Sequence, residues 1–344
     1  MTSIERFNAT VERKPVDRPA SWLGIPDPTA YDKFFRYFNV NSIDELKEKI
    51  DDDIYPVELP YHSDTGDAIY TAFDFAKDKR GSKEDRTLTS AGFFEDYDDP
   101  SIVDDFPWFA PDNYISKDLC KKAVDAVPVG KVALGVLWSS HFQDCCAAFG
   151  METALIKMIT APEMVAAVDD KLVNFYLRAN EIFYEATKGK LNAILIGNDL
   201  GSQLGLMLSP DLIRRFVLPG AKKLIAQAKE YGLKVIYHSC GAIYDIIPDL
   251  ISAGADVIHP IQALAVGMEP IRLKEAYGNQ VSFCGGIDAQ NLLINGNPKE
   301  VAAKVRELSK IFPTGLILSP SHEAILADTK PENIEAIFSE IHVI

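Results

Sequence analysis

The C-terminal two-thirds of the chain alternates short apolar runs with longer amphipathic stretches. The short runs are rich in Val, Ile and Leu, and Gly, Pro or a polar residue follows most of them. They occupy residues 131–138, 192–197, 234–238, 255–260, 281–286 and 315–320. Such runs are typical of strands buried on both faces. Helical periodicity fills several of the intervals, at 151–188, 209–232, 242–254 and 297–312. This alternation predicts βα units and therefore a parallel sheet.

The first 130 residues have a less regular pattern. Four prolines make 13–29 extended, and 30–40 and 42–50 have the periodicity of amphipathic helices. In the second of these helices, Ser42 and Glu45 have the spacing of a capping box. The acidic, proline-containing stretch 96–114 is expected to be a solvated surface connection.

Two further strand candidates, 52–59 and 19–24, bring the number of predicted strands to eight. Eight strands in a chain of this length favour a closed (β/α)8 TIM barrel over an open doubly wound sheet. No G-x-G-x-x-G follows any strand, which removes the strongest sign of a dinucleotide-binding fold. We expect one barrel domain over 1–344 with an irregular N-terminal extension.

Composition narrows the classes of function. The 344 residues carry a net charge of −15, which argues against nucleic acids and anionic membranes as partners. No apolar run is long enough for a transmembrane helix, and the charged N-terminus lacks an apolar signal region, so a cytoplasmic protein is expected. The five cysteines are too few and too irregular for a secreted disulfide framework, which leaves them as thiols or metal ligands.

Polar residues gather where the predicted strands end, which is where barrel enzymes carry their chemistry. Four of the six histidines and two of the five cysteines lie at these ends. In chain order the residues are Ser139, Ser140, His141, Asn198, Asp199, Gln203, His238, Cys240, His259, Gln262, Cys284, Asp288, Ser321, His322 and Glu323.

His238 and Cys240 form the candidate metal site. Side chains two apart on an extended chain point to the same side, so both can reach one ion. Thiolate and imidazole are zinc ligands, and three protein ligands with one open position mark a catalytic zinc site. His322 is the preferred third ligand, with Cys284 in reserve and Glu323 as a possible oxygen donor. The alternative is that His238 is a hydrogen-bonded histidine and Cys240 a small buried residue.

Three other residues are candidates for the substrate pocket. Asp199 is expected to act there as a base or acceptor, although it could instead cap a helix, and Gln203 lies near it in sequence. His141 could be a general base or could pack under the following helix. Cys145 and Cys146 are expected in the core, and His62 and His342 at the surface.

Three segments resemble the C-terminal half of the uroporphyrinogen decarboxylase superfamily: 238–262, 281–293 and 316–337. The stretch 12–24 looks like the opening segment of the family, and Asp53 could match its pyrrole-binding aspartate. This resemblance implies a (β/α)8 barrel. It also implies one of two activities, because the superfamily contains the decarboxylase itself and zinc-dependent methyltransferases that use a corrinoid (cobalamin) protein.

The motifs favour the methyltransferase branch, which includes methylcobalamin:coenzyme M methyltransferases. The arginine-rich decarboxylase signature is absent, whereas His238 and Cys240 match the H-x-C of the methyltransferases. That branch places a cysteine 75 to 80 residues later, where this chain has His322. The resemblance implies that zinc and a cobalamin on a separate corrinoid protein serve methyl transfer to or from a thiol, folate, methyl ether or amine. The alternatives are a decarboxylase and a non-catalytic barrel that binds a tetrapyrrole or corrinoid.

Overall fold

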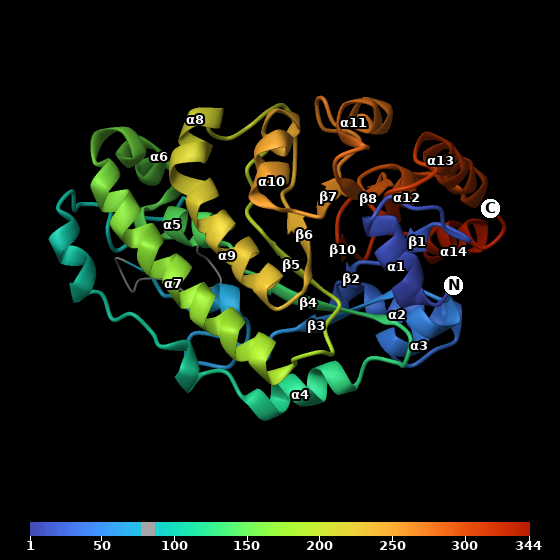
Figure 1. Ribbon diagram of the computed structural model, residues 1–344, viewed down its shortest axis with the longest axis horizontal. Helices are drawn as coiled ribbons and strands as arrows, with labels where there is room; N and C mark the ends of the chain where they lie inside the picture. The colour runs from blue at the N-terminus through green and yellow to red at the C-terminus, as the bar shows by residue number, and fades with distance from the viewer. Residues whose placement is uncertain (77–86, 88) are drawn as a thin grey trace.

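Eight parallel strands form the centre of the computed structural model, which describes residues 1–76, 87 and 89–344 (Figure 1). In sheet order they are β1 (Ala20–Ser21), β9 (Leu316–Pro320), β8 (Ser282–Ile287), β7 (Val257–Ile261), β6 (Lys234–His238), β5 (Ala193–Gly197), β4 (Val132–Trp138) and β3 (Ile54–Glu58). All eight predicted strands are present, and the predicted (β/α)8 barrel is confirmed. A two-stranded sheet of β2 (Ile25–Pro26) and β10 (Ala324–Ile325) lies beside it.

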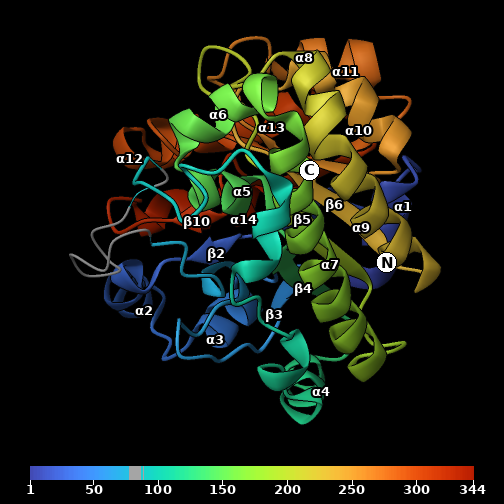
Figure 2. The same ribbon diagram turned by 90° about the vertical axis from the view of Figure 1, so that its left-hand side faces the viewer.

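Helices surround the strands (Figures 1 and 2). Their bounds are α1 (Ser3–Val11), α2 (Tyr31–Phe38), α3 (Ile43–Lys49), α4 (Lys117–Asp125), α5 (His141–Phe149), α6 (Met151–Thr160), α7 (Pro162–Ala186), α8 (Pro210–Leu212), α9 (Leu218–Glu230), α10 (Ile247–Ala253), α11 (Pro270–Tyr277), α12 (Leu292–Asn295), α13 (Pro298–Ile311) and α14 (Pro331–Ile341). The predicted helix at 151–188 is two helices, because Pro162 begins a new one. A π-helical turn at Ile213–Val217 joins α8 to α9.

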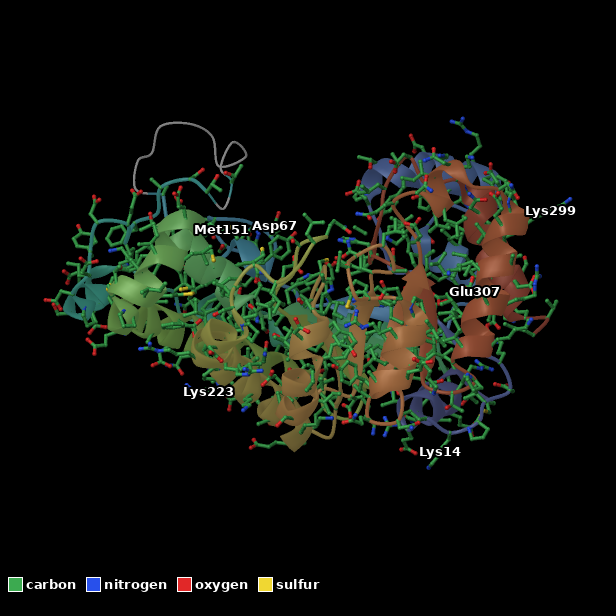
Figure 3. The ribbon with its side chains drawn as sticks, turned by 90° about the horizontal axis from the view of Figure 1, so that it is seen from above. Lys14, Asp67, Met151, Lys223, Lys299 and Glu307 are labelled. Atoms are coloured by element: carbon green, nitrogen blue, oxygen red, sulfur yellow. The ribbon has the colours of Figure 1, made fainter. Side chains whose placement is uncertain are left out.

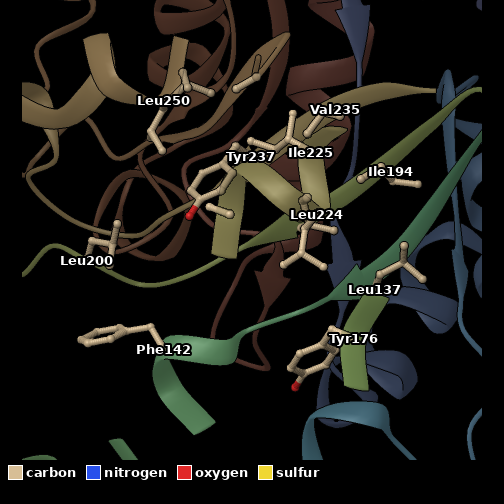
Figure 4. Close-up of a cluster of buried hydrophobic side chains, with 14 of the residues drawn as sticks. Leu137, Phe142, Tyr176, Ile194, Leu200, Leu224, Ile225, Val235, Tyr237 and Leu250 are labelled. Carbon is tan, nitrogen blue, oxygen red and sulfur yellow. The ribbon is translucent and has the colours of Figure 1, made fainter. Parts of the chain in front are cut away.

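The strand period of two divides the core into two layers. Leu195 and Ile236 point into the barrel, while Ile194 and Val235 point outward to the helices. Figure 4 shows the outer layer, where Ile194, Val235 and Tyr237 lie beside residues of α9. Burial on both faces explains why these strands read as continuous apolar runs.

The seam between β1 and β3 is closed by side chains. In the described residues β1 pairs only with β9, and β3 only with β4. The Asp53 carboxylate accepts a hydrogen bond from the Ser21 N–H at 3.0 Å, and Asp52 accepts one from the Leu23 N–H at 2.9 Å. Two buried carboxylates thus replace the backbone ladder at this point.

The α1 helix closes the N-terminal end of the barrel. Its Phe7 and Val11 belong to the interior layer of the core. The Ser282 hydroxyl at the start of β8 donates to the carbonyl oxygens of Thr10 and Val11 at 2.9 and 3.1 Å. Because this end is filled, a ligand can enter only from the end where the strands finish.

Two predictions for the N-terminal part need correction. The stretch 96–114 is not simply a solvated connection, because Val103 and Phe106 are buried and Phe106 stacks on Phe75 with ring centroids 4.9 Å apart. The apolar residues within the acidic run decide its position. The capping box is only half formed: Ser42 caps the Glu45 N–H, but the Glu45 carboxylate accepts from Asn41 instead.

Charged side chains cover the outside of the molecule. Lys14 and Lys299 project from its edge in Figure 3, and the Lys14 side chain is 66% exposed. Among the described residues, none of the helices has both the length and the apolar character needed to cross a membrane.

Candidate metal centre and substrate cavity

A cavity of about 640 Å³ opens at the C-terminal ends of the barrel strands. The loops after these strands and the segment 25–28 form its wall. It is lined by Ile25, Pro26, Asp27, Pro28, Glu58, Tyr70, Phe73, Phe75, Trp138, Ser140, Gln143, Asp144, Ala147, Gly197, Asp199, His238, His322, Glu323 and Ala324. This is where barrel enzymes place their active sites.

The phase of the strands points two histidines into the mouth of the barrel. Ile236 faces the interior, so His238 two residues later does too, and the same holds for Val257 and His259. Gly197 is in the same phase on the neighbouring strand β5. A Cβ atom there would lie 1.9 Å from the His238 carbonyl oxygen, so only glycine lets β5 and β6 approach this closely.

One ring nitrogen of His238 faces a sulfur and a carboxylate. The Nε2 atom lies 3.5 Å from the Cys240 Sγ and 3.2 Å from the Asp199 Oδ1. Asp199 is held in place because it also accepts the Cys240 N–H at 2.9 Å. The ligand atoms of these three residues all lie within 4.8 Å of one another.

The other ring nitrogen of His238 faces a second set of groups. Its Nδ1 lies 3.0 Å from the His259 Nδ1 and 3.5 Å from the Glu323 Oε2. A proton on Nδ1 of His238 can be donated to either group, so a metal ion that displaces the Nε2 proton would meet a lone pair directed toward Cys240 and Asp199. Metal-binding histidines commonly have this arrangement, in which a carboxylate or another acceptor fixes the tautomer.

Electrostatics at this point favour a positive charge. Burial works to lower the pKa of His238, but the carboxylates of Glu323 and Asp199 outweigh it and raise that pKa well above its usual range. Burial works to raise the pKa of Asp199, but hydrogen bonds from His238 and the Cys240 N–H hold it well below its usual range. Burial and the charge of His238 lower the pKa of His259, so this ring is neutral.

The two predicted candidates for the third ligand lie outside this group of atoms. His322 lines the cavity, but its Nδ1 accepts the Ala324 N–H at 3.0 Å, and its ring hydrogen-bonds Cys240. A ring that accepts at Nδ1 carries its proton on Nε2, so it is arranged as a donor. Cys284 is fully buried in the barrel interior, where burial raises its pKa. The geometry offers Asp199 as the third ligand instead.

His141 and Gln203 do not line the cavity. His141 is fully buried, and its Nδ1 lies 2.6 Å from the Asp169 carboxylate of α7. It also packs against α9, because a Cβ on Gly220 would lie 2.7 Å from its Cε1. His141 therefore packs under the following helices and is not placed to act as a catalytic base in the cavity. Gln203 is exposed, and its amide donates to Gln290 at 3.4 Å.

Of the three residues predicted for the substrate pocket, Asp199 lines the cavity, whereas His141 and Gln203 are not among its described lining residues.

The match of Asp53 to a pyrrole-binding aspartate is wrong, because Asp53 lies at the start of β3, away from the cavity. It is fully buried and bound by Arg6 at 2.6 Å and Arg18 at 2.8 Å. A carboxylate with these partners cannot bind a substrate.

Several lining residues were not found from the sequence. Trp138, the last residue of β4, has a φ of +53°, and Ser139 after it has the same value. The Trp138 ring meets the His238 ring edge-on, with their centroids 5.4 Å apart. Two successive non-glycine residues with positive φ are strained, which marks this strand end as functional. Glu58, the last residue of β3, also lines the cavity. The apolar pattern of the strand predicted at 52–59 did not indicate that this residue faces the mouth of the barrel.

The residues present fit a zinc ion. Cys240, His238 and Asp199 supply sulfur, nitrogen and oxygen, and each of these donors is common at zinc. Glu323 adds a buried carboxylate oxygen 3.5 Å from the Nδ1 of His238, where a partner of the metal-binding ring belongs.

Comparisons with known proteins identify the family of this chain. A methylated-thiol–coenzyme M methyltransferase of Methanosarcina mazei is 28% identical over 149 residues, which are 43% of this chain and 37% of that protein. The match therefore spans little more than a third of that relative. The solved structure of a methyltransferase from Methanosarcina mazei covers 100% of this chain and 99% of its own, with a TM-score of 0.72 at 16% identity. At that identity the likeness shows the fold. The uroporphyrinogen decarboxylase (URO-D) family model matches residues 88–344, so the chain belongs to this family.

Proposed function

We propose that this protein is a zinc-dependent methyltransferase that moves a methyl group between a corrinoid on a separate protein and a small substrate. The observation that carries the proposal is the group of His238, Cys240 and Asp199, of which His238 and Asp199 line the cavity. The H-x-C motif and the methyltransferase names of the two relatives support it.

The three residues would hold the metal through Nε2, Sγ and a carboxylate oxygen. When bound, zinc supplies Lewis acidity to a donor atom of the substrate at its remaining position. Glu323 and His259 keep the proton of His238 on Nδ1, so that Nε2 stays free as a ligand. Phe73 and Phe75 give the opposite wall an apolar surface that excludes water from the reacting groups.

The decarboxylase alternative has less support. A substrate with many carboxylates needs cationic partners. The described residues that line the cavity include five carboxylates but no lysine or arginine. A non-catalytic carrier would not need a set of sulfur, nitrogen and oxygen donors gathered at the cavity.

Metal analysis tests the proposal. Purified wild-type protein is expected to hold about one zinc per chain, measured by mass spectrometry, and to remove the methyl group of free methylcobalamin in the presence of an acceptor. His238→Ala and Cys240→Ala are expected to lose both properties. Cys284→Ala is the matched control, because this thiol lies outside the group and should keep the zinc. Zinc-free wild-type protein with full activity in His238→Ala would exclude the proposal.

A second comparison identifies the third ligand. Asp199→Asn is expected to weaken zinc binding by at least about tenfold, and His322→Ala by less, because in the described part of the chain the Asp199 carboxylate alone lies within 4.8 Å of both other donors. Zinc affinity is measured by competition with a chromogenic chelator. The reverse order would return the third position to His322.

A further inference from the structure

The wall of the cavity carries an unusual charge. Asp27, Glu58, Asp144, Asp199 and Glu323 all line it. The described part of the lining has no lysine or arginine, and its cationic side chains are His238 and His322, whose pKa values the neighbouring groups raise. A bound zinc ion would be neutralised by Asp199 and the Cys240 thiolate, so the other carboxylates would still face the cavity. Their number favours a ligand that brings a positive charge.

Two buried oxygens of the lining lack a hydrogen bond. Glu323 is 8% exposed, and its Oε2 faces the His238 Nδ1 at 3.5 Å without a hydrogen bond. The Gln143 Oε1 is buried and likewise without a hydrogen bond. Glu58, the last residue of β3, is exposed, and no hydrogen bond or ion pair of its carboxylate is found among the described residues. Buried acceptors without donors cost free energy, which a cationic ligand would recover.

Aromatic rings form another part of the same wall. Tyr70, Phe73, Phe75 and Trp138 line the cavity, and the rings of Phe73 and Phe75 stack with centroids 5.3 Å apart. Ring faces attract cations that have shed much of their water, and methylated ammonium groups are bound in this way. Carboxylates alone would suit a metal or a lysine, whereas carboxylates together with aromatic rings suit a bulky apolar cation.

We propose that the substrate is a small cation that carries its methyl group on a quaternary ammonium or sulfonium centre and a separate hydroxyl oxygen that can reach the zinc. This inference rests on the proposed methyl transfer and names its substrate class. In the transfer, the bond between the methyl carbon and the nitrogen or sulfur breaks, and its electron pair stays on that atom. A reduced corrinoid supplies the pair for the new bond to carbon, and its cobalt goes from Co(I) to Co(III). No proton is gained or lost.

The charge of the product gives this scheme a direction. The demethylated amine or thioether is neutral, so it loses the attraction of Asp27, Glu58 and Glu323 once the methyl group has left. The same carboxylates that bind the substrate therefore favour product release. An anionic thiol would be repelled by this wall.

Equilibrium binding of matched probes tests the inference. Choline and 3,3-dimethyl-1-butanol have the same shape and differ in charge, and 2-mercaptoethanesulfonate is a small anion. Calorimetry on the zinc-loaded wild-type protein should show choline binding at least about tenfold more tightly than the neutral probe, with the anion weakest. Glu58→Gln should weaken choline binding by about three- to tenfold. Glu275→Gln on α11 is the control, because this exposed glutamate does not line the cavity.

The outcomes separate this inference from the proposed function. Equal affinity for choline and its neutral analogue, or preference for 2-mercaptoethanesulfonate, would overturn the cationic substrate even if methyl transfer to a thiol is observed. Cation selectivity that persists in His238→Ala would support it even if zinc and activity are lost. Turnover of choline against (2-hydroxyethyl)dimethylsulfonium with Co(I) cobalamin then tells whether nitrogen or sulfur carries the methyl group.

Discussion

At the scale of single residues, the two nitrogens of His238 have different tasks. Nε2 faces Cys240 and Asp199, and Nδ1 faces His259 and Glu323. The second pair would not touch the metal, yet it determines which nitrogen is free to bind it. Groups of this kind usually contribute 10- to 100-fold to metal affinity.

Glu323→Gln is therefore expected to weaken zinc binding by about 10- to 100-fold while Cys240 remains reactive toward thiol reagents. The amide cannot supply the negative charge that holds the Nδ1 proton. Chelator competition measures the change, and Glu307→Gln on the exposed face of α13 is the control. Unchanged affinity in Glu323→Gln would show that His259 alone orients the ring.

Asp144 gives a prediction about pH. Burial raises its pKa from 3.8 to about 7, although its carboxylate accepts a hydrogen bond from the Tyr176 hydroxyl. The folded state thus holds this proton more tightly than the unfolded state does, so stability falls as pH rises from about 4 to about 7. Relative to Asp144→Asn, the wild-type free energy of unfolding should fall by on the order of 2–4 kcal/mol between pH 4 and pH 8. Urea unfolding at several pH values measures it, and a constant difference between the two proteins would contradict the raised pKa.

At the scale of elements, the barrel depends on side chains where its backbone ladder is interrupted. Asp53 joins β3 to the Ser21 N–H of β1 and to the guanidinium groups of Arg6 and Arg18. The same carboxylate thereby connects α1, which closes the N-terminal end, to the seam. The shape of the open end is thus maintained from the opposite end of the barrel.

Asp53→Asn is expected to lower the free energy of unfolding by about 3–5 kcal/mol, because it removes the buried anion that Arg6 and Arg18 share and leaves them only the more exposed Asp17 and Asp51. The neighbouring Asp51→Asn is the control. Asp51 also pairs with Arg18, but its side chain is 57% exposed, so its loss should cost less than about 1 kcal/mol. Urea unfolding curves compare the two variants, and similar costs would show that the seam is held by packing alone.

At the scale of the whole molecule, metal binding and folding are linked. An ion that binds only the folded chain stabilises it by about 2.7 kcal/mol at a free concentration one hundred times its Kd. A chelator should therefore lower the Tm of the wild-type protein by a few degrees and leave that of His238→Ala unchanged. Differential scanning calorimetry measures both. An equal shift in both proteins would place the metal elsewhere in the chain.

The sequence by itself determined the barrel and one side of its site. Burial on both faces produces continuous apolar strands, and the two-residue period directs His238 and Cys240 to one point. Both are local properties of the chain, so they can be read without knowing what packs against them. The strand ends also drew attention to Asp199, whose role was then left open between the pocket and a helix cap.

Only the tertiary structure decided which distant residues complete the site. Asp199 lies about forty positions before Cys240, and Glu323 more than eighty after it, and no local pattern reports how parallel strands stagger around a barrel. From the sequence, His141 could face either the cavity or the helices. In the fold it faces the helices, where it pairs with Asp169 of α7. Cys284 shares the chemistry of a ligand but packs inside the barrel. The acidic, aromatic wall is likewise assembled from separate loops, since charge and shape in a cavity depend on contacts between segments far apart in the chain.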